Sequence, residues 1–206
     1  MNGVITGYVG IHVIWIERIF DDPRVNVFEA WSPSLDFLFA VFLGYTIYDM
    51  LTMAFQSHHW SMWIHHLLGL LGCIVVPIYK QALIYPCYFM VTEWTVIFNN
   101  LVWFVKTIRD SDAKSPSLLY VYLLHARAWS FFALRIWVGP YSVYHSIVAA
   151  GGLQTVIQFW ASLHWTASFY GIATTAMFSF FNVVWTVAIF QKAFAASAKL
   201  KRAKQE

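Results

Sequence analysis

Long apolar stretches separated by short polar segments dominate this chain and predict about six membrane-spanning helices. Each stretch approaches the roughly 20 residues that a helix needs to cross a bilayer, and a helix satisfies its backbone hydrogen bonds without water. The expected spans are residues 3–19, 35–55, 62–79, 83–105, 118–138 and 171–194. Pro23, Pro33 and Pro116 fall in the expected connections, where helix breakers are common. The predicted fold class is an all-α integral membrane bundle.

The pattern of residues 139–170 does not predict a simple membrane span. Gly139-Pro140 and Gly151-Gly152 predict helix breaks, whereas residues 153–165 are apolar enough to lie in the interface or to re-enter the membrane. The sequence therefore leaves room for a seventh, interfacial or re-entrant element before the last span.

Composition and charge agree with a membrane protein and predict its orientation. Of the 206 residues, 60% are hydrophobic and only 11% are charged, too few for a water-soluble surface. Lys and Arg gather at residues 106–114 and 192–204 and are missing from 139–170, which predicts a multi-pass protein with both termini in the cytosol. We expect one transmembrane domain over residues 1–195 and a basic cytosolic tail over 196–206. Membrane phosphates explain this charge better than a nucleic-acid partner does.

Several ionisable side chains lie inside the expected spans, where each is costly and needs a structural or functional reason. Asp49, His65 and His66 lie toward the cytosolic side of two spans with a short connection, so a contact between carboxylate and imidazole is expected. Tyr45 lies one turn before Asp49 on the same helix face. In a catalytic site, a histidine of this pair would act as base or nucleophile and Asp49 would orient it.

A second polar set lies near the expected midplane. Glu93 and Arg127 fall well inside their spans and predict a buried pair, which would either position a polar headgroup or join two helices. Asn100 follows Glu93 by about two helical turns and shares its face, so both are expected to face the bundle interior. Arg135 lies near the far end of its span, from which its side chain would extend to the interface or contact a headgroup.

Four histidines, His58, His59, His65 and His66, raise the alternative of a metal site, because imidazole is a common metal ligand. Five residues separate the two pairs and no second histidine box follows, unlike the repeated boxes of membrane di-iron enzymes. We therefore expect neither a metal nor a resident cofactor.

The order of these motifs resembles the TLC-domain family of membrane proteins. The resemblance rests on Gly44-Tyr45-Thr46-Ile47-Tyr48-Asp49, His65-His66-Leu67-Leu68, Thr92-Glu93, Phe98-Asn99-Asn100, Trp103-Phe104, and Phe131 with Arg135. His12 and residues 22–34 also resemble the transmembrane branch that contains TLC-domain protein 4. The resemblance implies a lipid-handling protein of the endoplasmic reticulum or another endomembrane, with membrane lipids or a lipid substrate as partners.

The resemblance leaves open whether the chain is an enzyme. Ceramide synthases, the best-known enzymes of the family, N-acylate sphingoid bases from acyl-CoA and share the His65-His66 pair. Where they carry a second His-Asp pair and a further Asp, this chain has Thr92-Glu93 and Val96. One hypothesis is thus a related acyltransferase with acyl-CoA as co-substrate. The other is a non-catalytic lipid-binding, membrane-composition or trafficking factor. A proton-coupled transporter is a third, without the inverted repeat that would support it.

Overall fold

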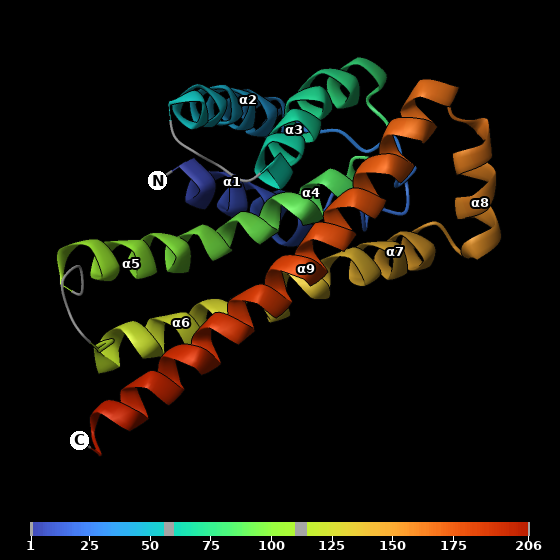
Figure 1. The fold of residues 1–206 in the computed structure, drawn as a ribbon. Helices are drawn as coiled ribbons and strands as arrows, with labels where there is room; N and C mark the ends of the chain where they lie inside the picture. The colour runs from blue at the N-terminus through green and yellow to red at the C-terminus, as the bar shows by residue number, and fades with distance from the viewer. Residues whose placement is uncertain (1, 56–59, 110–114, 206) are drawn as a thin grey trace.

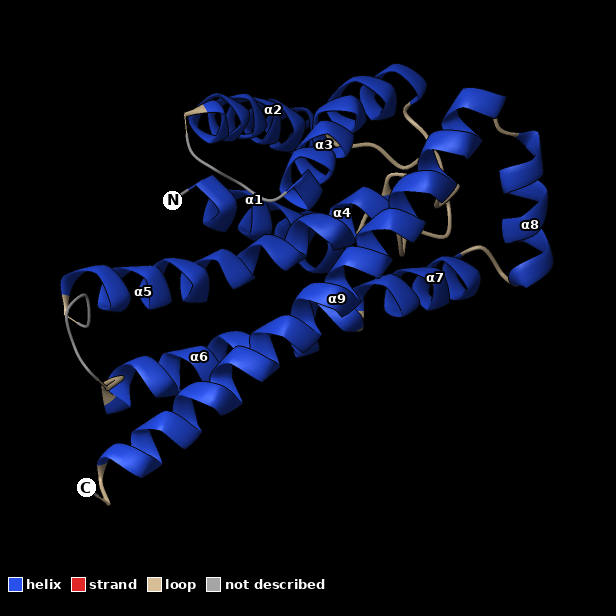
Figure 2. Ribbon diagram, in the orientation of Figure 1, coloured by secondary structure: helices blue, strands red, loops and turns tan. Residues whose placement is uncertain are grey.

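The computed structural model describes residues 2–55, 60–109 and 115–205, and all regular structure in these ranges is helical (Figures 1 and 2). The helices are α1 (Asn2–Ile11) with the π-helix η1 (His12–Glu17), α2 (Pro33–Ala54), α3 (Trp60–Tyr79), α4 (Ile84–Val91), the 3₁₀ turn η2 (Thr92–Trp94), α5 (Thr95–Ile108), α6 (Leu118–Phe131), the π-helix η3 (Phe132–Ile136), α7 (Val138–Ala149), α8 (Leu153–Ser162) and α9 (Trp165–Ala203). Because α4, η2 and α5 run on from one another, as do α6, η3 and α7, the described residues form seven continuous helical segments.

A helical segment lies in each of the six expected spans, with bounds that differ by up to a few residues at most of the ends. Three helices, α2, α3 and α9, are each long and apolar enough to cross a membrane, and Gly3–Glu17 is a shorter apolar helix. The segments made of α4 to α5 and of α6 to α7 are interrupted by a 3₁₀ turn and a π-helix, so neither is one long regular helix.

The fifth segment differs from its prediction. It does not end at Val138 but continues through Gly139-Pro140 to Ala149. Pro140 lies in the first turn of α7, where a missing backbone N–H and a fixed φ are tolerated, so it does not break the helix. The break comes at Gly151 and Gly152, whose φ angles of 77° and 145° are accessible to glycine.

The anticipated seventh element is α8. Its ten residues are too few to cross a bilayer, and it runs across one end of the molecule between α7 and α9 (Figure 1). In contrast, α9 has 39 residues and is about 58 Å long, well beyond the hydrocarbon core of a bilayer. Its last turns include residues 196–203, so this part of the expected tail is helical and continuous with the preceding span.

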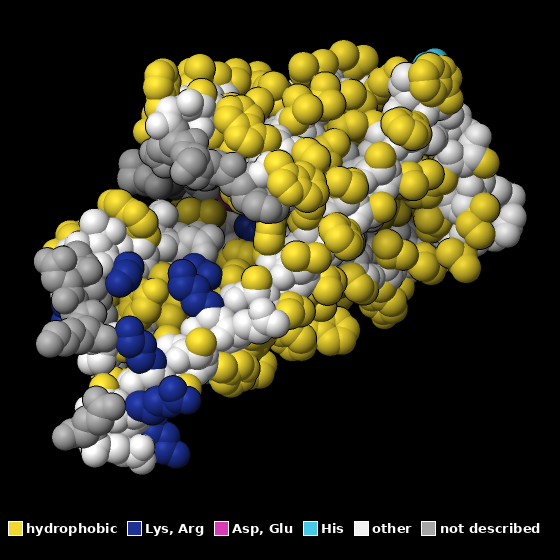
Figure 3. Space-filling model, in the orientation of Figure 1, with side chains coloured by type: hydrophobic (Ala, Val, Ile, Leu, Met, Phe, Trp, Pro, Cys, Tyr) yellow, Lys and Arg dark blue, Asp and Glu magenta, His cyan; other side chains and the backbone are white. Residues whose placement is uncertain are grey.

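The connections fall at two opposite ends of the molecule (Figure 1). The basic end comprises the N-terminus, the C-terminal ends of α5 and α9 and the start of α6. The α8 end comprises residues 18–32, residues 80–83 and α8. Lys and Arg gather over α5, α6 and the C-terminal part of α9, whereas hydrophobic side chains cover α2, α3 and the rest of α9 (Figure 3). An apolar outer surface of this kind is expected to face lipid.

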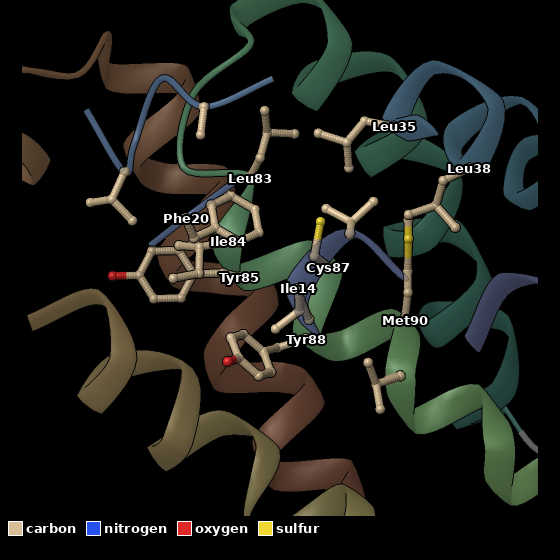
Figure 4. Packing of buried hydrophobic residues seen from close by; sticks show 14 of the residues in the cluster. Ile14, Phe20, Leu35, Leu38, Leu83, Ile84, Tyr85, Cys87, Tyr88 and Met90 are labelled. Atoms are coloured by element: carbon tan, nitrogen blue, oxygen red, sulfur yellow. The ribbon is translucent and has the colours of Figure 1, made fainter. Parts of the chain in front are cut away.

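Two hydrophobic clusters hold the helices together. The larger lies toward the α8 end and joins the first helical segment and residues 20–30 to α2, α4, α7 and α8; Leu35, Leu83, Ile84 and Tyr88 are among its most buried members (Figure 4). The smaller lies toward the basic end and packs α5, α6 and α9 around Leu124. Because the larger cluster fixes one end firmly, a cavity can exist between the helices without loss of the fold.

Candidate functional site

A cavity of about 650 Å³ lies among α2, α3, the α4–α5 and α6–η3 segments and α9. It lies within the roughly 300–1,000 Å³ typical of small-molecule sites. All eight residues that the sequence singles out line it: Tyr45, Asp49, His65, His66, Glu93, Asn100, Arg127 and Arg135. The fold thus gathers side chains from four helical segments around one space.

The cavity is amphipathic. Its ionisable lining residues include Asp49, the histidine pair and Glu93. The remaining wall is largely apolar and includes Phe39, Phe42, Val75, Val76, Phe89, Ala167 and Trp160, which continue toward the α8 end. A ligand that fills this space must therefore have a polar part and an extended apolar part.

The contact that the sequence predicts between Asp49 and the histidine pair is made by His66. The Asp49 Oδ2 atom lies 3.7 Å from His66 Nε2, at an ion-pair distance rather than a short hydrogen bond. Tyr45 lines the cavity near the same carboxylate. His66 is buried while Asp49 is partly accessible, so this pair can contact a ligand and still be partly shielded from water.

His65 is held in an aromatic enclosure. Its ring centroid lies 5.1 Å from that of Phe178, 5.3 Å from that of Trp185 and 5.3 Å from that of His66. Its Nδ1 atom is buried and has no hydrogen-bond partner in the part of the chain that the structure describes. A buried ring nitrogen without a partner is costly, which makes it available to a polar group of a ligand.

Glu93 pairs with Arg135 and not with Arg127, contrary to the prediction. The Arg135 Nη2 atom lies 3.7 Å from Glu93 Oε1, and both side chains are buried. Arg135 also donates from Nε to Thr95 Oγ1 at 3.0 Å and from Nη1 to Asn182 Oδ1 at 3.4 Å. The prediction that Arg135 extends to the interface is therefore wrong as well. Because α7 continues the helical segment to Ala149, Arg135 lies in the middle of the α6–α7 segment and not near the end of that segment.

Arg127 lies about two turns from Arg135, on the side of the basic end. It lines the cavity without reaching Glu93, and its Nε atom is buried with no hydrogen-bond partner among the described residues. An arginine donor in this position has the fork geometry that binds phosphate or carboxylate oxygens.

Asn100 departs from its expected place beside Glu93. Both residues line the cavity, yet Glu93 is buried and Asn100 is exposed. The 3₁₀ turn η2 contains Glu93 and is wound more tightly than an α-helix, which rotates the following residues relative to an ideal α-helical stripe. Asn100 therefore belongs to the rim of the site.

Two further residues of α9 contribute to the site and were missed in the sequence. Asn182 accepts from Arg135 and donates from Nδ2 to the Arg135 carbonyl oxygen at 3.3 Å. Tyr170 donates to the Leu68 carbonyl oxygen at 2.6 Å and joins α9 to α3. An amide within the apolar span 171–194 was the available signal for Asn182. Nothing local marks Tyr170, because its partner is a backbone carbonyl far away in the sequence.

The metal alternative involves residues that the structure only partly describes. His58 and His59 lie outside the described residues. Among the described residues, no group of three or more His, Cys, Asp or Glu side chains is arranged to hold a metal ion. Cys73 and Cys87 are both buried free thiols.

These features define an all-helical integral membrane protein with a polar site inside its helix bundle. The sequence matches the TLC domain, the domain shared by the TRAM, LAG1 and CLN8 proteins, over residues 1–191. The chain therefore belongs to the TLC-domain family, a family of membrane proteins related to lipids. The match is to the domain as a whole and not to one branch of it. No curated protein and no solved structure matches the chain.

Proposed function

We propose that the chain binds one membrane lipid in its central cavity, with the polar part of the lipid at the Asp49, His66 and Glu93 groups and an acyl chain along the apolar wall. The observation that carries this proposal is the amphipathic lining of a single cavity of about 650 Å³. Ionisable residues at membrane depth are usually functional, and here they surround the same space. Family membership agrees with a lipid ligand.

The proposal includes an orientation in the membrane. Six crossings, by α1 with η1, α2, α3, α4–α5, α6–α7 and α9, would leave both termini at the basic end, which would face the cytosol by the positive-inside rule. An endomembrane such as the endoplasmic reticulum is the proposed location. Kinship to the branch of TLC-domain protein 4 is supported by the resemblance of His12 and residues 22–34.

Two neighbouring positions on α9 provide a test of lipid binding. Thr175 lines the cavity, whereas Ala176 is exposed on the outer surface. Thr175→Trp is expected to fill the cavity and remove most co-purified lipid, and Ala176→Trp is expected to retain it. Native mass spectrometry of the detergent-solubilised proteins measures the occupancy. Equal lipid occupancy in the two variants would contradict the proposal.

A second candidate function is acyl transfer, and the contact between Asp49 and His66 inside the cavity favours it. His66 would accept a proton as an amine or hydroxyl of the acceptor lipid attacks the thioester carbonyl of acyl-CoA. The carbon–sulfur bond would then break, and the departing thiolate would receive the proton from His66. Asp49 would stabilise the imidazolium formed in between.

The two functions are separated by one pair of measurements. The purified chain is incubated with acyl-CoA and a mixture of amine and lysolipid acceptors, and acylated products are identified by lipidomics. If acyl transfer operates, His66→Ala is expected to lower product formation by about 10²–10⁴-fold while lipid occupancy remains. Lipid occupancy without any product in the wild type would leave a binding, membrane-composition or trafficking role.

A further inference from the structure

Three cations come together at the basic end beside the cavity. Lys192 of α9 lies close enough to Arg127 of α6 and to Lys106 of α5 for its charge to interact with both. They come from the three helices that form the smaller hydrophobic cluster, so their approach is set by helix packing and not by flexible loops. The result is a concentration of positive charge carried by three packed helices.

Each of the three cations lies on a helix face that lines the cavity. Arg127 lines the cavity directly. Lys192 follows the lining residue Ala188 by one helical turn, and Lys106 follows the lining residue Asn99 by about two turns. Both lysines therefore extend the lined faces of α9 and α5 beyond the cavity, toward the basic end.

This arrangement differs from ordinary positive-inside charge. Lys and Arg side chains that only follow the positive-inside rule are solvated and need not point toward one site. In contrast, the Arg127 Nε donor is buried and has no partner in the described ranges. A buried donor without a partner destabilises a protein, and an anion that accepts from it would remove that cost. An anion at this point would lie between all three helices and at the end of a space suited to an acyl chain.

On the basis of the proposed lipid binding, we propose that Arg127, Lys192 and Lys106 bind the phosphate of an acyl-chain ligand at the basic end of the cavity. The planar guanidinium of Arg127 pairs with two phosphate oxygens, and the lysines act as neighbouring point charges. The ligand class is an acyl compound that carries phosphate, either in a lipid headgroup or in an acyl-CoA. The acyl chain then runs past the histidine pair toward the α8 end.

The test compares ligands with the same acyl chain on the full-length chain in detergent. Lysophosphatidic acid and acyl-CoA carry phosphate, and monoacylglycerol does not. We expect at least one phosphate-bearing ligand to bind about tenfold more tightly than monoacylglycerol, since a charge-assisted contact is worth at least that much. Arg127→Gln is expected to abolish this preference, which is measured as the ratio of the two affinities. Lys192→Gln, at an exposed position that tolerates substitution, is expected to lower the preference about threefold. Lys201→Gln, a matched basic control near the end of α9, is expected to leave it unchanged.

The outcomes separate this inference from the proposal on which it rests. Tight binding of lysophosphatidic acid alone identifies a headgroup phosphate, and tight binding of acyl-CoA alone identifies a nucleotide phosphate; both support the inference. Equal affinity for all three ligands, or a preference that survives both Arg127→Gln and Lys192→Gln, overturns it and leaves lipid binding intact. Failure of the wild type to bind any of the three ligands overturns lipid binding itself, and the inference with it.

Discussion

The two ends of the molecule differ in how their charged side chains are paired. At the α8 end, His145 joins two distant segments: its Nε2 atom lies 2.7 Å from Asp21 Oδ1 and its Nδ1 atom lies 2.7 Å from the Tyr88 hydroxyl. Tyr85 and Ser146 are likewise paired at 2.9 Å. Toward the basic end, the described residues include a buried Arg127 donor without a partner, and cations that lie near one another.

The difference separates structural from functional polarity. Buried polar groups that satisfy one another add specificity and some stability to a fold. A buried group left without a partner lowers stability by about 1–3 kcal/mol, and a ligand that supplies the missing contact to Arg127 would remove this cost. The larger hydrophobic cluster also lies toward the α8 end. We therefore regard that end as the structural support and the cavity and basic end as the site.

The largest expected effect concerns the pair that lies between the two ends. Arg135→Met leaves the buried Glu93 carboxylate without its cation and removes the donors to Thr95 and Asn182. The expected loss of stability is about 3–5 kcal/mol. Thermal unfolding in detergent, followed by tryptophan fluorescence, measures it.

A double variant provides the control for this prediction. Glu93→Gln combined with Arg135→Met removes both charges and is expected to be more stable than Arg135→Met alone, because no isolated charge remains buried. If the single and double variants unfold at the same temperature, the ion pair is not the source of the effect.

The positions of the helices could be predicted well from the sequence. Hydrophobic stretches and their breakers are local signals, and a helical segment lies in every span expected from them. The continuation of the helix through Pro140 could not be predicted. A proline is tolerated in the first turn of a helix, and the sequence does not show that α7 begins just before Pro140, after η3. A proline one turn later would have broken the same helix.

The composition of the site was more predictable than its internal pairing. Each ionisable residue inside an apolar span is conspicuous, and all eight candidates line the cavity. Their catalytic or binding roles stay predictions. The choice of Arg135 over Arg127 as the partner of Glu93 depends on the length of the α6–α7 segment and on its π-helix, which changes the direction of the following side chains. Such a choice is tertiary information that no single stretch of sequence contains.

A smaller effect is expected where α3 and α9 approach one another beside the cavity. A Cβ atom at Gly72 would collide with the Tyr170 hydroxyl, which donates to the Leu68 carbonyl oxygen. Gly72→Ala should therefore lower stability by about 1–3 kcal/mol and also reduce lipid occupancy. Gly44→Ala is the matched control, because a Cβ atom there meets nothing within 4 Å. Similar losses of stability in both variants would rule out the close approach as the cause.

The smallest effect tests the paired polarity of the α8 end through pH. Partial burial by itself raises the pKa of Asp21, but the hydrogen bonds to His145 and Arg18 outweigh it and bring the pKa below its usual value of 3.8. A carboxylate whose pKa is lowered by folding adds stability above its unfolded pKa, and this contribution disappears as the pH falls through the folded pKa. Asp21→Asn should thus lower stability by about 1 kcal/mol at pH 5–7, and this difference from the wild type should vanish as the pH falls below 3.8.

Glu29→Gln, at an exposed position on the same connection, is the control for this pH series and is expected to follow the wild type. The pH series also separates the two ends, because Asp21 lies at the α8 end and does not line the cavity. The affinity of Asp21→Asn for a lysolipid is therefore expected to equal that of the wild type at pH 7, although its unfolding temperature is lower. A stability difference that persists unchanged at pH 3 would show that Asp21 acts through its shape and not its charge. A parallel fall in lysolipid affinity would show that the α8 end takes part in binding.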